Sequence, residues 1–138
     1  MKSIEEQLVL HEGLKLNPYR CPAGKLTIGV GRNLEDKGIS MAEALFLLRN
    51  DVEEVRTQLE RYPWYTQLDP VRQKVLIDMA FNLGIGGLMQ FRKMLAALEA
   101  GDYGKTADEM LDSKWARQVG KRAQRLAEMM RTGEDYID

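Results

Sequence analysis

The spacing of hydrophobic residues predicts a chain built mostly of helices. Between positions 41 and 60, apolar side chains recur at steps of three and four residues, the period that places them on one face of a helix. They are Leu45, Leu48, Val52, Val55 and Leu59. Ser40 and Glu43 come just before, with the spacing of a capping box at a helix start. We therefore predict a long amphipathic helix from about residue 41 to 60.

A second helix is predicted by signals at both of its ends. Asp69 as N-cap and Pro70 at the first helical position mark its start, and Gly84 marks its end. Its apolar positions leave little polar surface: Val71, Val75, Leu76, Met79, Ala80 and Leu83. We expect this helix to be the buried centre of the fold. Shorter apolar patterns predict further helices before Gly101, after Asp102 and before Gly133. Ser3 and Glu6 have the spacing of a capping box for a short first helix that ends near Gly13.

One segment departs from the helical pattern. Residues 19–31 read YRCPAGKLTIGVG, in which a turn of proline and glycine precedes a run of β-type residues. This pattern predicts a small β-hairpin. The expected fold class is therefore α+β, mostly α.

Length and composition limit the kinds of protein to consider. A chain of 138 residues with 44% hydrophobic content is the size of one domain with its own core. The single Cys21 excludes an intramolecular disulfide, and no cluster of His and Cys has the spacing of a zinc site. No run of 18 apolar residues occurs, so we expect neither a signal peptide nor a membrane helix, and an initial location in the cytoplasm without stable membrane association.

Charge is unevenly distributed along the chain. The formal net charge is −1, but six basic residues between 114 and 131 are balanced only by Glu128. They are Lys114, Arg117, Lys121, Arg122, Arg125 and Arg131. This segment could present a basic face to an anionic polymer, although charge runs are more often solvated helix faces.

Glu12 is the first candidate for chemistry. It lies just before the helix end predicted at Gly13, where exposed carbonyl groups favour a protonated carboxyl. Such a carboxyl can act as a general acid, and hydrolysis of a glycosidic bond needs an acid together with a second group on the opposite face of the sugar. A glutamate at a helix end is more often a solvated surface residue, so the spacing of its neighbours decides the interpretation.

That spacing carries a family resemblance. Residues 10–32, LHEGLKLNPYRCPAGKLTIGVGR, resemble the signature of the phage lysozymes of glycoside hydrolase family 24, in which E-G leads through a Tyr and a turn to T-I-G-x-G. The resemblance implies catalytic roles for Glu12, Cys21 and Thr27. It extends over most of the chain through four further matches: residues 51–52, 81–84, 113–115 and 131–133.

The resemblance also implies an architecture and a reaction. We expect a lysozyme-like, two-lobed fold, with a trimmed hairpin lobe over about residues 13–45. The 41–60 helix would join it to a helical C-terminal lobe, about 60–138, that includes the first helix. The implied activity is that of a muramidase and endolysin: hydrolysis of the β-1,4 bond between N-acetylmuramic acid and N-acetylglucosamine in bacterial peptidoglycan. No cofactor or metal is implied, and we expect a monomer held in the host cytoplasm until lysis.

Cys21 departs from the best-known members, which carry Asp at this position. A free thiol has a pKa of about 8.5 and is mostly protonated at neutral pH. Cys21 could orient a water together with Thr27, which gives inversion, or attack the sugar as a thiolate, which gives retention. Without the motif, Cys21 would be interpreted as a small buried hydrophobe and Thr27 as an ordinary strand residue.

Further roles follow from matching the rest of the chain to the family. Arg32 stands where many relatives have a His that pairs with the Asp of the long helix, so we expect an ion pair between Arg32 and Asp51. Arg122 and Arg125 match arginines near the catalytic Glu and are predicted to orient Glu12.

Two residues are candidates for contact with the sugar. Asn82 offers amide hydrogen bonds, and Trp115 offers an apolar face near the expected cleft between the lobes. Either could instead be a structural residue.

Three alternatives differ in chemistry or in class. A lytic transglycosylase also needs an acid glutamate but no second catalytic side chain, so the missing Asp keeps it open. A protein that binds peptidoglycan without cleaving it would retain the cleft and lack turnover. A nucleic-acid-binding module built on the basic segment is disfavoured, because no base-reading motif is present.

Overall fold

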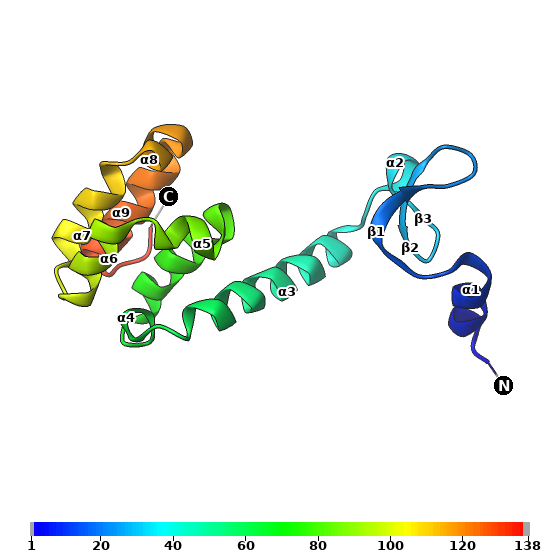
Figure 1. Cartoon of the computed structure of the whole chain (residues 1–138), viewed down its shortest axis with the longest axis horizontal. Helices are drawn as coiled ribbons and strands as arrows, with labels where there is room; N and C mark the ends of the chain where they lie inside the picture. Colours follow the sequence, from blue (N-terminus) through cyan, green and yellow to red (C-terminus); the bar gives the residue numbers. More distant parts are fainter. Residues whose placement is uncertain (1, 137–138) are drawn as a thin grey trace. The chain divides into compact units, whose positions relative to one another are not determined.

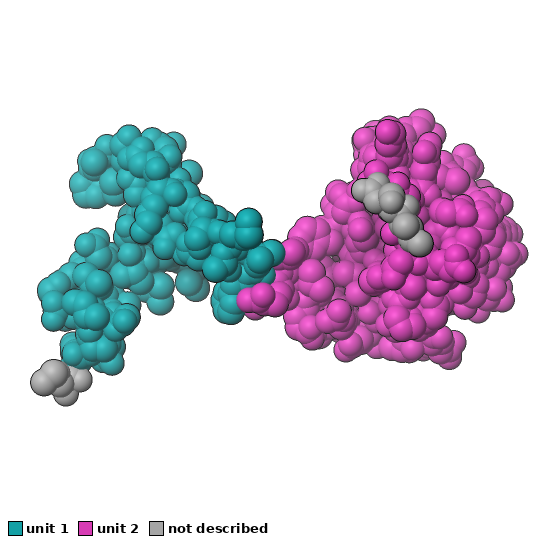
Figure 2. Space-filling view, turned by 180° about the vertical axis from the view of Figure 1, so that it is seen from behind, with its two compact units in different colours: residues 1–47 teal, residues 48–138 magenta. Residues whose placement is uncertain are grey.

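The computed structural model describes residues 2–136 and has the predicted α+β, mostly helical composition. These residues fall into two compact units, divided between Leu47 and Leu48 (Figure 2). We call them unit 1, the N-terminal part, and unit 2, the C-terminal part. The first helix falls in unit 1; its assignment to the C-terminal lobe and the lobe limits stay predictions.

Unit 1 contains a short helix and a small sheet. Ser3 caps α1 (Ile4–Glu12) by accepting a hydrogen bond from the Glu6 N–H, and Gly13 ends it with a φ of 78°. The sheet is antiparallel in the order β1 (Lys15–Arg20), β2 (Leu26–Gly29) and β3 (Arg32–Asn33). The predicted hairpin is therefore present, with a first strand that begins four residues earlier and with an additional third strand.

Two more helices follow the sheet. Asn33 caps α2 (Leu34–Lys37) by accepting a hydrogen bond from the Asp36 N–H. The long helix α3 (Met41–Leu59) has the predicted bounds to within one residue. Its capping box is formed: the Glu43 N–H donates to Ser40 Oγ at 3.1 Å, and the Ser40 N–H donates to Glu43 Oε1 at 2.8 Å.

Unit 2 continues from α3 as a set of helices (Figure 1). They are α4 (Pro63–Thr66), α5 (Pro70–Met89), α6 (Arg92–Glu99), α7 (Tyr103–Leu111), α8 (Lys114–Val119) and α9 (Lys121–Thr132). Asp69 caps α5 as predicted, since its carboxylate accepts a hydrogen bond from the Arg72 N–H. Gly84, with φ 76° and ψ 159°, interrupts α5 at the predicted end.

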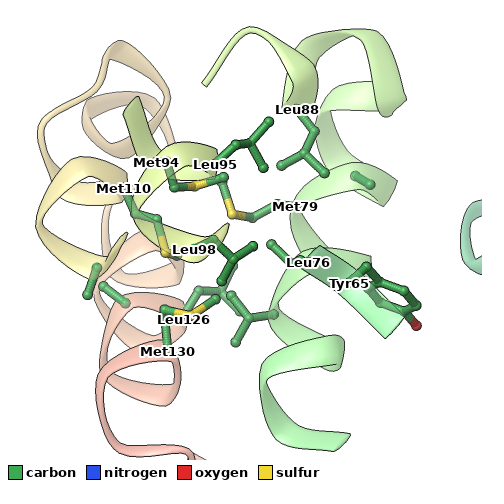
Figure 3. Packing of buried hydrophobic residues seen from close by; sticks show 14 of the residues in the cluster. Tyr65, Leu76, Met79, Leu88, Met94, Leu95, Leu98, Met110, Leu126 and Met130 are labelled. Atoms are coloured by element: carbon green, nitrogen blue, oxygen red, sulfur yellow. The ribbon is translucent and has the colours of Figure 1, made fainter. Parts of the chain in front are cut away.

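The hydrophobic core lies in unit 2. Val75, Leu76 and Met79 are fully buried, which confirms that α5 contributes to the core, whereas the most extensive helix contacts are those of α7 with α6 and α9. Side chains of α6, α7 and α9 meet this face of α5 (Figure 3). The residues labelled there are Tyr65, Leu76, Met79, Leu88, Met94, Leu95, Leu98, Met110, Leu126 and Met130.

One arginine ties three helices of unit 2 together. Arg72, near the start of α5, donates from Nε to the Met130 carbonyl at 2.7 Å and from Nη2 to the Arg131 carbonyl at 3.1 Å. Its guanidinium also bonds Asp69 and lies 3.8 Å from the ring centre of Tyr103 in α7. Because the last carbonyls of a helix have no partner within it, Arg72 satisfies two groups at the end of α9.

No helix within residues 2–136 combines the length and the apolar character needed to cross a membrane.

Candidate functional site

The three residues with implied catalytic roles lie within unit 1. Glu12 is the last residue of α1, Cys21 directly follows β1, and Thr27 lies on β2. The sheet register pairs Thr27 with Tyr19, two residues before Cys21, which brings Thr27 beside the start of the turn after β1.

The carboxyl of Glu12 lies against the turn between β2 and β3. A Cβ atom on Gly31 would come within 3.0 Å of Glu12 Oε2 and 3.3 Å of its Cδ. Gly31 has a φ of +68°, in the left-handed region that favours glycine. Sequence reasoning missed this contact, and the only signal for it was the last glycine of the T-I-G-x-G motif. Gly31 therefore leaves the space that the Glu12 carboxyl occupies.

Cys21 begins a tight turn that lowers the pKa of its thiol. The Cys21 N–H donates to the Lys25 carbonyl at 2.9 Å, and the Gly24 N–H donates to the Cys21 carbonyl at 2.7 Å. The backbone N–H of Lys25 has the largest effect on the pKa of the Cys21 thiol and lowers it, since it stabilises the thiolate. Partial burial raises the pKa, whereas the Ala23 N–H and the Thr27 hydroxyl lower it further. The net direction is downward, toward a more reactive thiol.

Thr27 is the one buried residue among those described in unit 1, with 3% of its surface exposed. Its hydroxyl donates to the Lys25 carbonyl at 2.8 Å and is also a hydrogen-bond partner of the Cys21 thiolate. A hydroxyl has one proton to donate. The Thr27 hydroxyl can therefore donate its proton either to the Lys25 carbonyl or to the Cys21 thiolate. Which of the two it bonds can depend on whether Cys21 is ionised.

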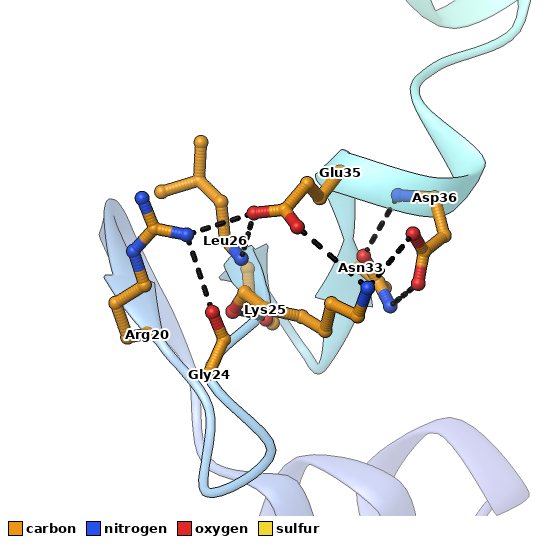
Figure 4. Close-up of polar contacts among 8 residues, drawn as sticks. Arg20, Gly24, Lys25, Leu26, Asn33, Glu35 and Asp36 are labelled. Carbon is orange, nitrogen blue, oxygen red and sulfur yellow. Dashed lines mark hydrogen bonds and ion pairs between the residues drawn. The ribbon is translucent and has the colours of Figure 1, made fainter.

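A polar network surrounds this turn (Figure 4). Arg20 Nη1 donates to Glu35 Oε1 at 2.7 Å and to the Gly24 carbonyl at 3.2 Å. Glu35 Oε1 also accepts the Leu26 N–H at 3.3 Å, and Glu35 Oε2 lies 3.7 Å from Lys25 Nζ. Sequence reasoning assigned no role to Glu35, and no motif position pointed to it.

Arg32 binds a different residue from the one that we predicted. Its guanidinium pairs with both carboxylate oxygens of Glu43, at 2.7 and 2.8 Å, rather than with Asp51. Glu43 is in the first turn of α3, and Asp51 is eight residues further, about 12 Å along the helix axis. The hydrogen bond from Arg32 is the main reason that the pKa of Glu43 falls to about 2, and the Ser40 cap lowers it further.

The two arginines predicted to orient Glu12 lie in unit 2 with other partners. Arg122 Nη2 lies 2.7 Å from Asp78 Oδ1, and the Arg125 guanidinium is 4.8 Å from the ring centre of Tyr136. Their action on Glu12 stays a prediction.

Trp115 and Asn82 contact each other. Trp115 is 4% exposed, and its indole N–H donates to Asn82 Oδ1 at 2.8 Å. The Trp115 ring also packs edge to face with Phe91, at 6.1 Å between centres. Trp115 is therefore a core residue, whereas the Asn82 side chain is exposed. A contact of either residue with a sugar stays a prediction.

Unit 2 also has a hollow of about 470 Å³ with charges of both signs. Its lining includes Arg92, Lys93, Glu109, Asp112, Lys114 and Trp115. Across the described residues, no three His, Cys, Asp or Glu side chains lie close enough together to hold a metal ion.

Comparison with known proteins identifies related sequences. The family model described as phage lysozyme matches residues 9–132. The chain is 26% identical over 163 residues to probable T4-type lysozyme 1 of Dictyostelium discoideum, covering 96% of each protein. It is 32% identical over 129 residues to the endolysin of Acyrthosiphon pisum secondary endosymbiont phage 1, covering 86% of this chain and 84% of that protein. It is also 29% identical over 160 residues to the pre-baseplate central spike protein Gp5 of Enterobacteria phage T4, of which it spans only 28% of the length.

Proposed function

Since the chain belongs to the phage lysozyme family, we propose that it is a muramidase acting on bacterial peptidoglycan. It hydrolyses the β-1,4 bond between N-acetylmuramic acid and N-acetylglucosamine and thereby lyses the host cell. Relatives whose names are lysozyme and endolysin align over most of this chain, which supports the proposal. Its action begins when the protein reaches the cell wall from the host cytoplasm.

The observation that carries the proposal is the arrangement of Glu12 and Cys21 in one small unit. The Glu12 carboxyl lies on the β2–β3 turn, and the pKa of the Cys21 thiol is lowered by backbone N–H groups, first among them that of Lys25. A general acid and an activated nucleophile are the two groups that a retaining glycosidase requires.

In the proposed reaction, Glu12 protonates the glycosidic oxygen while the Cys21 thiolate attacks the anomeric carbon. The bond from that carbon to oxygen breaks, a carbon–sulfur bond forms, and the first sugar product leaves. Water then attacks the anomeric carbon, its proton passes to the Glu12 carboxylate, and Cys21 leaves as a thiolate. The alternative is that Cys21 and Thr27 hold the attacking water in a single displacement. The anomer of the first product, followed by NMR, separates the two routes: retention supports the thiolate and inversion eliminates it.

A turbidity assay on purified peptidoglycan tests the activity. We expect the wild type to clear the suspension and Glu12→Gln to lose about 10²- to 10⁴-fold in rate, as is typical for loss of a general acid. Glu5→Gln, an exposed position on the same helix, is the matched control and should behave as wild type. Binding of the wild type without clearing would contradict the proposal and indicate a protein that only binds the wall.

Two further measurements refine the chemistry. Mass spectra of the products distinguish hydrolysis, which adds water across the bond, from a lytic transglycosylase, which leaves an anhydro end. Cys21→Asp should keep activity because it restores a carboxylate at that position. Cys21→Ser should lose activity, because a serine hydroxyl is not ionised at neutral pH.

A further inference from the structure

The turn that carries Cys21 is held at both of its ends by one carboxylate. Glu35 Oε1 accepts a hydrogen bond from Arg20, the residue before Cys21, and from the N–H of Leu26, the residue after Lys25. Glu35 Oε2 is 3.7 Å from Lys25 Nζ. We call these three contacts the Glu35 tether. They link Arg20 and Leu26, the paired strand residues on either side of the turn, and Lys25, its last residue, to a single side chain.

The base of the Glu35 tether is fixed to the sheet. Glu35 lies in α2, whose N-cap is Asn33, and Asn33 is also the last residue of β3. In the sheet, Asn33 pairs with Thr27 of β2. Glu35 therefore connects the turn to the sheet residue whose hydroxyl is a partner of the Cys21 sulfur.

What the tether controls is the position of the Lys25 backbone. Lys25 lies between the two tethered ends, and its backbone bonds Cys21. Hydrogen bonds weaken steeply with distance and misalignment, so a small opening of the turn would remove the N–H of Lys25 from the sulfur. The local geometry thus couples the Glu35 carboxylate to the Cys21 thiol without direct contact.

We propose that Glu35 is a positioning residue for Cys21, which keeps the Cys21–Lys25 turn closed so that the Lys25 N–H faces the sulfur. This role of Glu35 affects turnover through the role of Cys21 in the reaction and therefore rests on the proposed function. The effect of Glu35 on the reactivity of the thiol can be measured without any substrate.

The negative charge of Glu35 and the Glu35 tether should move the pKa of the Cys21 thiol in opposite directions. A nearby negative charge disfavours a thiolate, whereas a closed turn favours it. The other charged groups around the turn are Arg20 at the end of β1, Lys25 in the turn, Asp36 on α2, and Glu12 of α1, whose carboxyl lies against the neighbouring β2–β3 turn. Removing only the charge should therefore make the thiol slightly more reactive, and removing the tether should make it less reactive.

The test measures the rate at which iodoacetamide alkylates the protein as a function of pH. Cys21 is the only cysteine of the chain, so the rate reports this thiol alone. Glu35→Ala removes the tether, and we expect alkylation at pH 7 about fivefold slower than in wild type, the effect of weakening one hydrogen bond to a charged group. Glu35→Gln retains the acceptor oxygen and loses the charge, and should react at the wild-type rate or slightly faster.

Asp36→Ala is the matched control. It removes a carboxylate from the same helix that reaches the turn only through Lys25 Nζ, at 3.3 Å. Its thiol should react as in wild type or faster. Equal rates in Glu35→Ala and wild type would overturn the proposal, and so would a faster thiol in Glu35→Ala than in wild type. Circular dichroism of each variant verifies that the fold is retained.

Peptidoglycan clearing by the same variants separates this proposal from the proposed function. If the wild type is active, Glu35→Ala should move the pH dependence of alkylation and the pH profile of clearing to higher pH by the same amount. A general loss of stability would not produce this shared shift. If the wild type does not clear peptidoglycan, the proposed function fails. A slower thiol in Glu35→Ala still supports the positioning role in that case, because alkylation requires no turnover.

Discussion

Units 1 and 2 are stabilised by different kinds of interaction. Unit 2 has a contiguous core in which Val75, Leu76, Met79 and other apolar side chains are fully buried. Unit 1 has one buried residue among those described, Thr27, and is held by helix caps, short strands and ion pairs. Burial is non-directional, whereas hydrogen bonds depend on geometry. The candidate catalytic groups thus lie where geometry is set by directional contacts.

This difference predicts which substitutions alter which property. Changes in the core of unit 2 should lower the free energy of unfolding and leave the rate of peptidoglycan clearing by the folded protein unchanged. Changes at the glycines and polar contacts beside Glu12 and Cys21 in unit 1 should alter the rate before they alter the stability. Two substitutions test that separation, and a third tests how an ion pair of unit 1 that is not beside these residues contributes to stability.

The largest effect is expected from Met79→Ala in unit 2. Met79 is fully buried in α5, and removal of such a side chain lowers the free energy of unfolding by about 2–5 kcal/mol through lost burial and the cavity left behind. Urea unfolding measures the change. Met41→Ala, at a position 79% exposed, is the control and should change stability little. A loss below about 1 kcal/mol in Met79→Ala would contradict the assignment of the core.

A smaller effect, mainly on rate, is expected from Gly31→Ala in unit 1. The added Cβ would lie 3.0 Å from Glu12 Oε2, so the carboxyl must give way by a few tenths of an ångström, and displacement of the proposed general acid should lower the rate by up to about tenfold. Gly38→Ala is matched, because Gly38 also has a positive φ, +65°, and a Cβ there meets nothing within 4 Å. Both variants place alanine at a positive φ and so both strain the backbone, and urea unfolding of each measures that cost. Equal rates of peptidoglycan clearing in the two would contradict the role of Gly31.

The smallest effect is expected from Glu43→Gln, on the pH dependence of stability. The hydrogen bond from Arg32, with the Ser40 cap, holds the pKa of Glu43 at about 2, below its ordinary value of 4.5. A carboxyl with a lowered pKa stabilises the folded state above its unfolded pKa, and that contribution disappears as the pH falls through the folded pKa. The difference in melting temperature between wild type and Glu43→Gln should therefore shrink between about pH 4.5 and pH 2.

Glu54→Gln, an exposed carboxylate on the same helix, is the control for loss of one charge. A difference between wild type and Glu43→Gln that persists unchanged at pH 2 would show that the ion pair with Arg32 does not stabilise α3.

The helices were predicted well because their signals are local. Ser40 and Asp69 make their capping bonds within four residues, and Gly84 interrupts α5 through its own backbone angles. The first strand was missed in part, since Lys15 pairs with Gly29, fourteen residues away, and a segment containing Pro18 has no strand pattern of its own. Strand structure there depends on the partner.

The residues of the candidate site also differ in how far local sequence signals predicted them. Motif spacing pointed to Glu12, Cys21 and Thr27, but Gly31 and Glu35 act through contacts across turns, for which the sequence has no spacing rule. The family resemblance predicted Asp51 of the long helix as the partner of Arg32, whereas Arg32 pairs with Glu43 of the same helix. Identifying that partner requires the orientation of the helix start relative to the sheet.

The contacts of Arg72 affect how unit 2 can fold while the chain is being synthesised. Arg72 in α5 bonds carbonyl groups of Met130 and Arg131, almost sixty residues later in the chain. During synthesis, which proceeds from the N-terminus, α5 emerges from the ribosome long before those carbonyls exist. Until residue 131 is outside the ribosome, α5 exposes the apolar face that α9 will cover. A ribosome stalled before that point would carry an unprotected core, and such a nascent chain should be the form most exposed to proteases and chaperones.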